Sequence, residues 1–324
     1  MVVTATLALV IVIWCVYRMR RYPLAKGLRR LAPVYVPSVL ASRPIIRLAN
    51  RMLLAMPRPE ATRLVDEEEG AIDLGDHILN YVIYRPKNAS GPLPAMLYMH
   101  GGGFFLEAAP YLYGKAMGYS SGAGCIVMVP RYRTSDVHPW PAGEDDCMAA
   151  LGHLCSLDGV DATRIALGGD SAGACIAATL ARRCRKEGIG VCFQLLVYPV
   201  LDDGLTSASS LRYRACPAWN TALSRRMWDM YLGGRRGEYV SPLAENDFSC
   251  LPPAYIEAAR YDSLHDDALS YADMLREAGV EVEFHDVEGA SHGYDAMVSC
   301  DVARRMLAVR IRALSRAFRI QEEE

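Results

Sequence analysis

The sequence predicts an α/β protein with a mostly parallel central sheet flanked by helices, and three observations support this prediction. A chain of 324 residues, 52% of them hydrophobic, is long enough for one large domain with a sizeable core. Short apolar runs alternate with stretches of helical pattern, which is typical of strands joined by helical crossovers. The runs cover residues 94–99, 125–129, 163–168, 191–198, 254–259 and 281–287. Glycine-rich turns follow two of them, so we expect functional groups at strand ends.

The remaining elements are predicted in chain order around these runs. Residues 71–73 and 77–84 indicate a hairpin that precedes the parallel strands. Small residues over 172–181 predict a helix directly after the third run, and a further helix is expected over 264–278. The sequence contains no internal repeat and no low-complexity tract.

Two glycine motifs carry the chemistry that the sequence predicts. Residues 100–103 read His-Gly-Gly-Gly and follow an apolar strand, and residues 169–173 read Gly-Asp-Ser-Ala-Gly. Gly-x-Ser-x-Gly on a sharp strand-to-helix turn exposes a nucleophilic serine hydroxyl. A glycine run lets backbone N–H groups approach a reacting carbonyl, although by itself it also fits a flexible turn. The Ser motif alone has little specificity in a chain with 26 glycines, whereas the pair predicts acyl transfer by Ser171.

A general base for Ser171 is expected later in the chain, because acid and histidine follow the serine in enzymes with this turn. Three histidines do so, namely His265, His285 and His292. His292 lies in a turn-rich loop directly after the last predicted strand. His285 alternates within that strand and His265 lies in the first turn of a predicted helix, so both fit structural positions. We therefore predict His292 as the base.

The acid that orients this histidine is predicted to be Asp262. It follows the run 254–259 near a strand end, where functional loops concentrate in parallel sheets. Asp262 could also act as a helix N-cap. Asp266 and Asp267 compete for the same role, but they are expected on the helix rather than in the loop.

These motifs together resemble the hormone-sensitive-lipase-like branch of the α/β-hydrolase superfamily, which includes arylacetamide deacetylase and many bacterial carboxylesterases. The resemblance covers about residues 70–310. Its carriers are residues 100–103, residues 169–173, Asp262-Ser263-Leu264-His265-Asp266 and His292-Gly293-Tyr294. Ser263 replaces the family's usual proline and Tyr294 its phenylalanine, and residues 131–136 also depart from the usual pattern. None of these departures removes a catalytic atom.

The resemblance implies an α/β-hydrolase fold with a helical cap and assigns each site residue a role. Ser171 would be the nucleophile, His292 the general base and acid, and Asp262 the orienting carboxylate. The N–H groups of Gly102, Gly103 and Ala172 would form the oxyanion hole. Cap helices would come from the region before about residue 65 and from an insertion at about 203–245.

A serine carboxylesterase that hydrolyses lipophilic, short-to-medium acyl esters through an acyl-enzyme on Ser171 is the function that this resemblance implies. An amide-directed hydrolase, such as a deacetylase or formamidase, would use the same residues and stays open as an alternative. A non-catalytic ligand-binding protein on the same scaffold is the second alternative, although such proteins tend to lose a member of the triad. The natural substrate and the oligomeric state are not predicted.

The amino terminus divides into two segments ahead of a catalytic domain at 66–324. Residues 1–17 are a candidate membrane anchor, because Val2 to Tyr17 carry no charge, although sixteen residues fall just short of the ~17–25 that cross a bilayer. Residues 18–65 form a basic amphipathic segment, with eleven Lys or Arg and a single acidic residue over 18–63. The positive charge follows the apolar run, which predicts membrane association with a cytoplasmic catalytic domain. The alternative is a cytoplasmic protein whose apolar helix packs into its own cap.

Cofactors and other partners are not expected. The ten cysteines form no Cys-x-x-Cys pair, so we predict no metal site and reduced thiols. No phosphate loop or dinucleotide fingerprint is present, which predicts no cofactor. Nucleic-acid binding is not predicted either, because apolar residues interrupt the basic segment. The remaining partner is a small-molecule ester.

Overall fold

The computed structural model describes residues 2–87 and 89–319, so the last five residues of the predicted 66–324 domain and Met1 lie outside the described part. Eight strands form one sheet in the order β1-β2-β4-β3-β5-β6-β7-β8. The strands β3 to β8 run parallel, while β1 and β2 pair antiparallel to each other and β2 to β4. The strands are β1 Val65–Asp73, β2 Ile78–Pro86, β3 Leu93–Met99, β4 Ile126–Pro130, β5 Val160–Asp170, β6 Phe193–Val197, β7 Ala254–Ala259 and β8 Val282–Val287. This confirms the predicted α/β fold class.

The first strand is longer than the sequence predicted. We expected a strand only over 71–73, whereas β1 begins at Val65 and pairs with β2 over nine residues. Most of β1 is charged, with three consecutive glutamates, and its side chains alternate between exposed and half-buried. An edge strand of this kind has no apolar run, so the hydrophobic pattern that predicted the other strands does not detect it.

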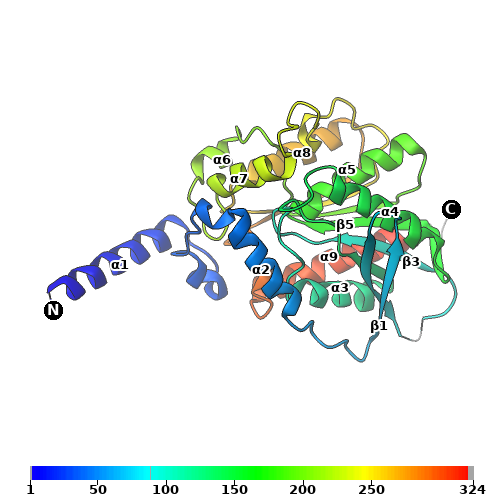
Figure 1. Ribbon diagram of the computed structural model, residues 1–324, viewed down its shortest axis with the longest axis horizontal. Helices are drawn as coiled ribbons and strands as arrows, with labels where there is room; N and C mark the ends of the chain where they lie inside the picture. Colours follow the sequence, from blue (N-terminus) through cyan, green and yellow to red (C-terminus); the bar gives the residue numbers. More distant parts are fainter. Residues whose placement is uncertain (1, 88, 320–324) are drawn as a thin grey trace.

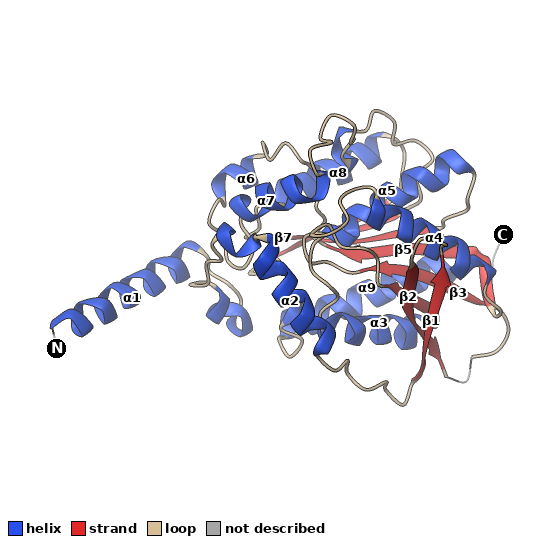
Figure 2. Ribbon diagram, viewed as in Figure 1, coloured by secondary structure: helices blue, strands red, loops and turns tan. Residues whose placement is uncertain are grey.

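Helices cover both faces of the sheet (Figures 1 and 2). On one face α3 (Pro110–Ala123) packs against α9 (Asp301–Arg319), and both contact the sheet through one buried cluster. On the other face lie α4 (Ala142–Ser156), α5 (Ala172–Glu187) and α8 (His265–Glu277). The predicted helices over 172–181 and 264–278 correspond to α5 and α8, and α5 continues to Glu187 before Gly188 ends it in a left-handed conformation.

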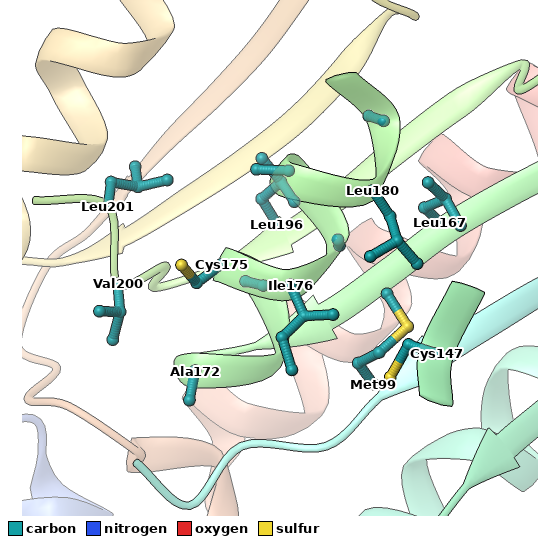
Figure 3. Packing of buried hydrophobic residues seen from close by; sticks show 14 of the residues in the cluster. Met99, Cys147, Leu167, Ala172, Cys175, Ile176, Leu180, Leu196, Val200 and Leu201 are labelled. Atoms are coloured by element: carbon teal, nitrogen blue, oxygen red, sulfur yellow. The ribbon is translucent and has the colours of Figure 1, made fainter. Parts of the chain in front are cut away.

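Small residues let α5 lie close to the sheet at its first turn. Figure 3 shows Ile176 and Leu180 of α5 on the side where Met99 and Leu167 of the strands lie, whereas Cys175 points toward Val200 and Leu201. All these side chains are at most 1% exposed. The close approach fixes the start of α5 relative to the ends of β3 and β5, where the two glycine motifs lie.

Two separate segments form helices beside the sheet that we call the cap. The first holds η2 (Ser38–Ala41) and α2 (Arg43–Ala55), and the second holds α6 (Ala208–Arg212) and α7 (Thr221–Leu232). The segments contact each other, since α7 packs on η2 and Asn220 donates a hydrogen bond to the carbonyl of Val36 at 2.8 Å. This arrangement agrees with the predicted helical cap.

The first helix, α1 (Val2–Arg21), projects away from the rest of the molecule (Figure 1). Its attachment is at its carboxyl end, where the buried Arg18 guanidinium donates to the carbonyls of Ala32, Val34 and Ala215. The side chains from Leu9 to Ile13 are 53–59% exposed, so this stretch does not pack into the cap. Across residues 2–87 and 89–319, no helix combines the length and the apolarity needed to cross a membrane.

Candidate active site

Ser171 lies on a sharp turn between β5 and α5, with φ 55° and ψ −118°. A non-glycine residue holds such a conformation only where its surroundings impose it. Neighbouring glycines make the turn possible, because a Cβ on Gly169 would lie 2.4 Å from the backbone of Gly173. The Ser171 N–H donates to the carbonyl of Val197 at 2.9 Å, which anchors the turn to the end of β6. The serine therefore stands at the carboxyl edge of the sheet, as the motif predicts.

Hydrogen bonds join Ser171, His292 and Asp262 in one line. The Ser171 Oγ lies 2.8 Å from Nε2 of His292, and Nδ1 of His292 lies 2.6 Å from Oδ2 of Asp262. Because a carboxylate only accepts, Nδ1 carries the proton and Nε2 is left to accept from the serine hydroxyl. Asp262 is fully buried, and its other oxygen accepts from the backbone N–H of Leu264 at 3.1 Å. The carboxylate thus holds the imidazole that faces the Ser171 hydroxyl.

The competing histidines and Asp266 have other partners. His285 contacts Glu283 at 2.8 Å and packs on Tyr255, and His265 contacts Asp266 at 2.7 Å. Asp266 lies in the first turn of α8, where its carboxylate accepts from the N–H of Ser209 at the start of α6. Its role is therefore to hold the cap insertion onto α8. Asp267 is also on α8, as the sequence predicted.

The glycine loop after β3 is held beside the serine turn. A Cβ on Gly173 would lie 2.1 Å from the carbonyl oxygen of Met99, so loop and helix touch. The N–H of Gly101 donates to Oδ1 of Asp170, the residue before the nucleophile, at 3.2 Å. Gly102 and Gly103 follow with φ angles of 119° and 62°, which glycine adopts without strain. The loop that contains Gly102 and Gly103 and the start of α5 therefore lie side by side.

His100, the first residue of the glycine loop, braces the loop rather than the substrate. Its imidazole is fully buried and stacks on Tyr132, with ring centroids 4.3 Å apart. The Tyr132 hydroxyl donates to the carbonyl of His100 at 2.6 Å. Burial lowers the pKa of His100, which favours the neutral ring.

Comparisons with known proteins agree with this geometry. Residues 96–296 match a family described as the alpha/beta hydrolase fold. The chain belongs to the α/β-hydrolase family. Esterase LipI of Mycobacterium tuberculosis is 36% identical over 263 residues, which cover 77% of this chain and 80% of that protein. The ethyl acetate hydrolase of Pseudomonas putida is 29% identical over 233 residues, which cover 69% of this chain and 73% of that protein.

Solved structures of this family superpose on almost the whole chain. A bacterial heroin esterase superposes with a TM-score of 0.84 at 29% identity, covering 92% of this chain and 99% of that one. Esterase LipW from Mycobacterium marinum gives a TM-score of 0.81 at 30% identity, covering 91% and 96%. The resemblance predicted from the motifs is thus confirmed at the level of the family.

Behind the site, this hydrolase buries a network of charges that sequence reasoning missed. The Lys115 ammonium lies 3.2 Å from Asp295 and 3.6 Å from Asp170, and Arg310 bridges Asp295 to Glu257. Burial alone lowers the pKa of Lys115, but the carboxylates of Asp170 and Asp295 outweigh it and raise that pKa. Burial alone raises the pKa of Asp295, but the cations Lys115 and Arg310 outweigh it and lower that pKa. A lone lysine within the apolar helix over 110–123 was the signal that could have revealed the network.

Tyr198 connects this network to the hydrogen-bonded residues Ser171, His292 and Asp262. Its hydroxyl donates to Oδ1 of Asp295 at 2.5 Å, and its ring packs edge-on against His292 with centroids 4.9 Å apart. The imidazole is therefore supported on one side by an aromatic ring whose own position is fixed by a buried carboxylate. Both residues are buried, at 2% and 7% exposure.

Two cap residues also reach the site, and the sequence did not separate them from core residues. Asn50 of α2 is buried, donates to the carbonyl of Phe105 at 2.9 Å and accepts from the N–H of Glu107 at 3.0 Å, so it grips the loop that continues from Gly103. Trp219, between α6 and α7, packs its indole ring 5.8 Å from the ring of His292. The large apolar residues of the predicted cap insertion therefore differ in position. Met227 and Trp228 are fully buried, whereas Trp219 faces the site.

Proposed function

We propose that this protein is a carboxylesterase in which Ser171 attacks the carbonyl carbon of an ester. The hydroxyl proton passes to Nε2 of His292 as the bond from Oγ to carbon forms. The tetrahedral intermediate then expels the alcohol, which takes that proton, and leaves an acyl-enzyme on Ser171. Water, deprotonated by the same imidazole, releases the carboxylic acid and restores the serine. The observation that carries this proposal is the line of hydrogen bonds from Ser171 through His292 to Asp262.

The oxyanion of each tetrahedral intermediate is proposed to bind the N–H groups of Gly102, Gly103 and Ala172. Donors held in place before reaction stabilise developing charge without reorganising, and each contributes roughly 3 kcal/mol in other serine hydrolases. The fixed loop and the start of α5 supply such donors from two elements that touch each other. Asp262 stabilises the imidazolium that forms at the same moment, because its carboxylate faces Nδ1.

Lipophilic esters of short-to-medium acyl length are the substrate class that we propose. The names of the relatives support esters, since they include an esterase, a carboxylesterase and an ethyl acetate hydrolase. The aromatic surroundings of the site, with Phe105 and Trp219 in contact at 6.2 Å between centroids, support an apolar substrate. Paired p-nitrophenyl ester and anilide assays separate this activity from the amide-directed alternative.

The nucleophile is tested by labelling the full-length protein with a fluorophosphonate probe and mapping the modified peptide. We expect modification of Ser171 alone and an inactive, unlabelled Ser171→Ala variant that unfolds at the temperature of the parent protein. Ser156→Ala, at an exposed serine, is the matched control and should keep full activity and labelling. Label on another serine, or an active Ser171→Ala variant, would refute the assignment.

We further propose that α1 attaches the protein to anionic membrane surfaces without crossing the bilayer. Large apolar side chains are exposed around the helix at Leu9–Ile13, Val16, Tyr17 and Met19. Exposed cations lie at and after its carboxyl end at Arg20, Arg21, Lys26, Arg29 and Arg30. Apolar insertion combined with basic side chains, each contributing about 1 kcal/mol near an anionic surface, is typical of interfacial helices.

Co-sedimentation with lipid vesicles tests this attachment. The full chain should sediment with vesicles that contain phosphatidylserine and bind less to vesicles of phosphatidylcholine alone. Ile11→Glu combined with Ile13→Glu should abolish sedimentation, whereas Val298→Glu, at an exposed valine remote in sequence, should not. Equal sedimentation of the parent and the double variant would overturn the proposal.

A further inference from the structure

Ser171, His292 and Asp262 lie under a cover formed by Phe105 and by the cap residue Trp219. Ser171 is 5% exposed and His292 is 7% exposed, although both must meet a substrate. Phe105, which follows the glycine loop, and Trp219, from the loop between α6 and α7, pack together over this region. Trp219 is itself half-buried, and its indole ring lies against His292.

The indole ring reaches the glycine that we assign to the oxyanion hole. A Cβ built on Gly103 would lie 2.7 Å from Cη2 of Trp219, so the far edge of the ring stands directly against this glycine. The same ring lies 5.8 Å from the imidazole of His292, centroid to centroid. The ring therefore borders the space between the proposed base and the proposed oxyanion donors, in which the reacting carbon would lie.

One hydrogen bond holds the indole ring, and two further features fix the backbone of Trp219. Nε1 of Trp219 donates to Oγ of the buried Ser224 on α7 at 2.9 Å, which holds the ring by its polar edge. The backbone carbonyl of Trp219 accepts from Sγ of Cys216 at 2.6 Å. The residue before it, Ala218, has φ 64°, a conformation that a non-glycine residue keeps only when its surroundings impose it. A side chain held in this way acts as a wall rather than as a freely swinging flap.

We propose that Trp219 sets the size limit for the acyl group of the substrate. The inference rests on the proposed function, because it takes Ser171 as the acylated residue. The alcohol departs after the first step, whereas the acyl group stays on Ser171 through both steps under the cap. A rigid indole beside the reacting carbon therefore excludes acyl groups by volume, and replacing it with a small side chain opens space for them.

The experiment compares kcat/KM for p-nitrophenyl acetate and p-nitrophenyl octanoate in full-length variants. Trp219→Ala should raise the ratio of octanoate to acetate activity by about tenfold to a hundredfold, since one methylene in an apolar pocket already changes activity by about tenfold or more. Trp219→Phe should stay within about threefold of the parent ratio, because it keeps a ring at this place. Leu211→Ala, on an exposed face of α6 in the same insertion, is the matched control and should leave the ratio unchanged.

The ratio separates a size limit from a loss of structure, because damage to the fold lowers both activities together. If Trp219→Ala does not fold, Trp219→Leu replaces it with the same expected direction. A ratio that stays within twofold of the parent in the folded small-residue variant would overturn the size limit. A methyl-substituted fluorophosphonate used in parallel tests the premise, since failure to label Ser171 in the parent would refute the proposed nucleophile instead.

Discussion

At the scale of single residues, the carboxylate of Asp262 makes two contacts, one with the backbone ahead of α8 and one with His292. One carboxylate oxygen accepts from the N–H of Leu264, two residues along the chain, as the side chain of an Asx-turn does. Asp262 is not the N-cap of α8, because Leu264 holds that position. The other oxygen faces Nδ1 of His292 at 2.6 Å. The first contact fixes the orientation of the carboxylate, and the fixed carboxylate in turn fixes the imidazole. Asp266 and Asp267 cannot replace it, because they lie one turn further along on α8.

Replacing the acid tests this arrangement. Asp262→Asn should lower kcat by about 10⁴-fold, because an amide no longer selects the tautomer that leaves Nε2 free to accept. KM should change little, since the substrate does not touch this side chain. Asp266→Asn, measured in the same p-nitrophenyl butyrate assay, should stay within about tenfold of the parent. A larger loss in the Asp266 variant would move the role of orienting acid to α8.

The oxyanion glycine gives a second prediction at this scale. Gly103→Ala should lower kcat/KM by about 10²-fold or more, because the loss of one oxyanion donor has this effect in other hydrolases. The added Cβ would meet Trp219 at 2.7 Å on a backbone with φ 62°, so the loop must shift. Gly114→Ala, within α3 and with open space around its Cβ, is the control and should retain activity. Full activity of Gly103→Ala would exclude this glycine from the oxyanion hole.

At the scale of elements, α2 completes the site although it lies far from Ser171 in sequence. Asn50 Nδ2 donates to the carbonyl of Phe105, and Asn50 Oδ1 accepts from the N–H of Glu107. These backbone groups belong to the loop that begins with the oxyanion glycines. The loop is therefore held by β3 at its start and by the cap at its end.

Removal of this grip should affect both stability and activity. Asn50→Ala leaves two loop groups without their partner and should lower the free energy of unfolding by about 1–3 kcal/mol. We expect a lower kcat as well, because the glycine N–H groups lose their fixed position. Arg51→Ala, at the exposed neighbouring position, should change neither quantity beyond error. Urea unfolding measures the stability and ester kinetics measure kcat on the same samples. An unchanged kcat in Asn50→Ala would show that the contact from α2 does not position the glycine loop for catalysis.

The first turn of α8 predicts a dependence of stability on pH. Burial, followed by the charges of Asp202, Asp262 and Asp266, raises the pKa of Asp267 to about 7. The folded chain therefore keeps a proton on Asp267 at pH values where the unfolded chain has released it. This contribution to stability is fully present below about pH 4, the ordinary pKa of an aspartate, and is lost as the pH rises through about 7.

Asp267→Asn should remove this contribution to the pH dependence, because an amide stays neutral. The free energy of unfolding of the variant relative to the parent should increase by on the order of 2 kcal/mol between pH 5 and pH 8. Asp273→Asn, at an exposed position on the same helix, should show no such trend. Urea titrations at three pH values suffice, and parallel curves for the parent and Asp267→Asn would contradict the raised pKa.

At the scale of the whole molecule, one buried arginine joins elements that are distant in sequence. Arg310 of α9 is fully buried and contacts Glu257 on β7, Asp295 after β8 and the hydroxyl of Tyr294. Through Asp295 the network continues to Lys115 on α3. The carboxyl ends of the strands are thus linked to both helices of one face.

Breaking this network at one member should be costly. Arg310→Leu leaves the charges of Glu257 and Asp295 buried with fewer partners and should lower the free energy of unfolding by about 3–5 kcal/mol. Arg316→Leu removes the exposed ion pair with Glu283 from the same helix and should change it by less than about 1 kcal/mol. Denaturant unfolding of both variants makes the comparison, and similar losses would show that burial does not govern the value of these contacts.

The sequence by itself determined the elements that depend on local pattern. Apolar runs predicted β3 to β7, because buried parallel strands are continuously hydrophobic, and the alternating residues 281–287 predicted the half-buried edge strand β8. The two glycine motifs located Ser171 and the loop of Gly102 and Gly103, since glycine allows close approach and left-handed backbone without strain. Most of the charged edge strand β1 was not predicted, because its stability comes from pairing with β2 rather than from a buried apolar run.

Only the tertiary structure decided which distant side chains meet. It brought His292 and Asp262 to Ser171 and left His265, His285 and Asp266 with other partners, a choice that depends on where loops converge at the sheet edge. It also selected Asn50 and Trp219 from cap helices whose patterns show only amphipathic packing. Contacts across more than fifty residues leave no periodic trace in the chain, because periodicity records which face a residue occupies and not what it touches there.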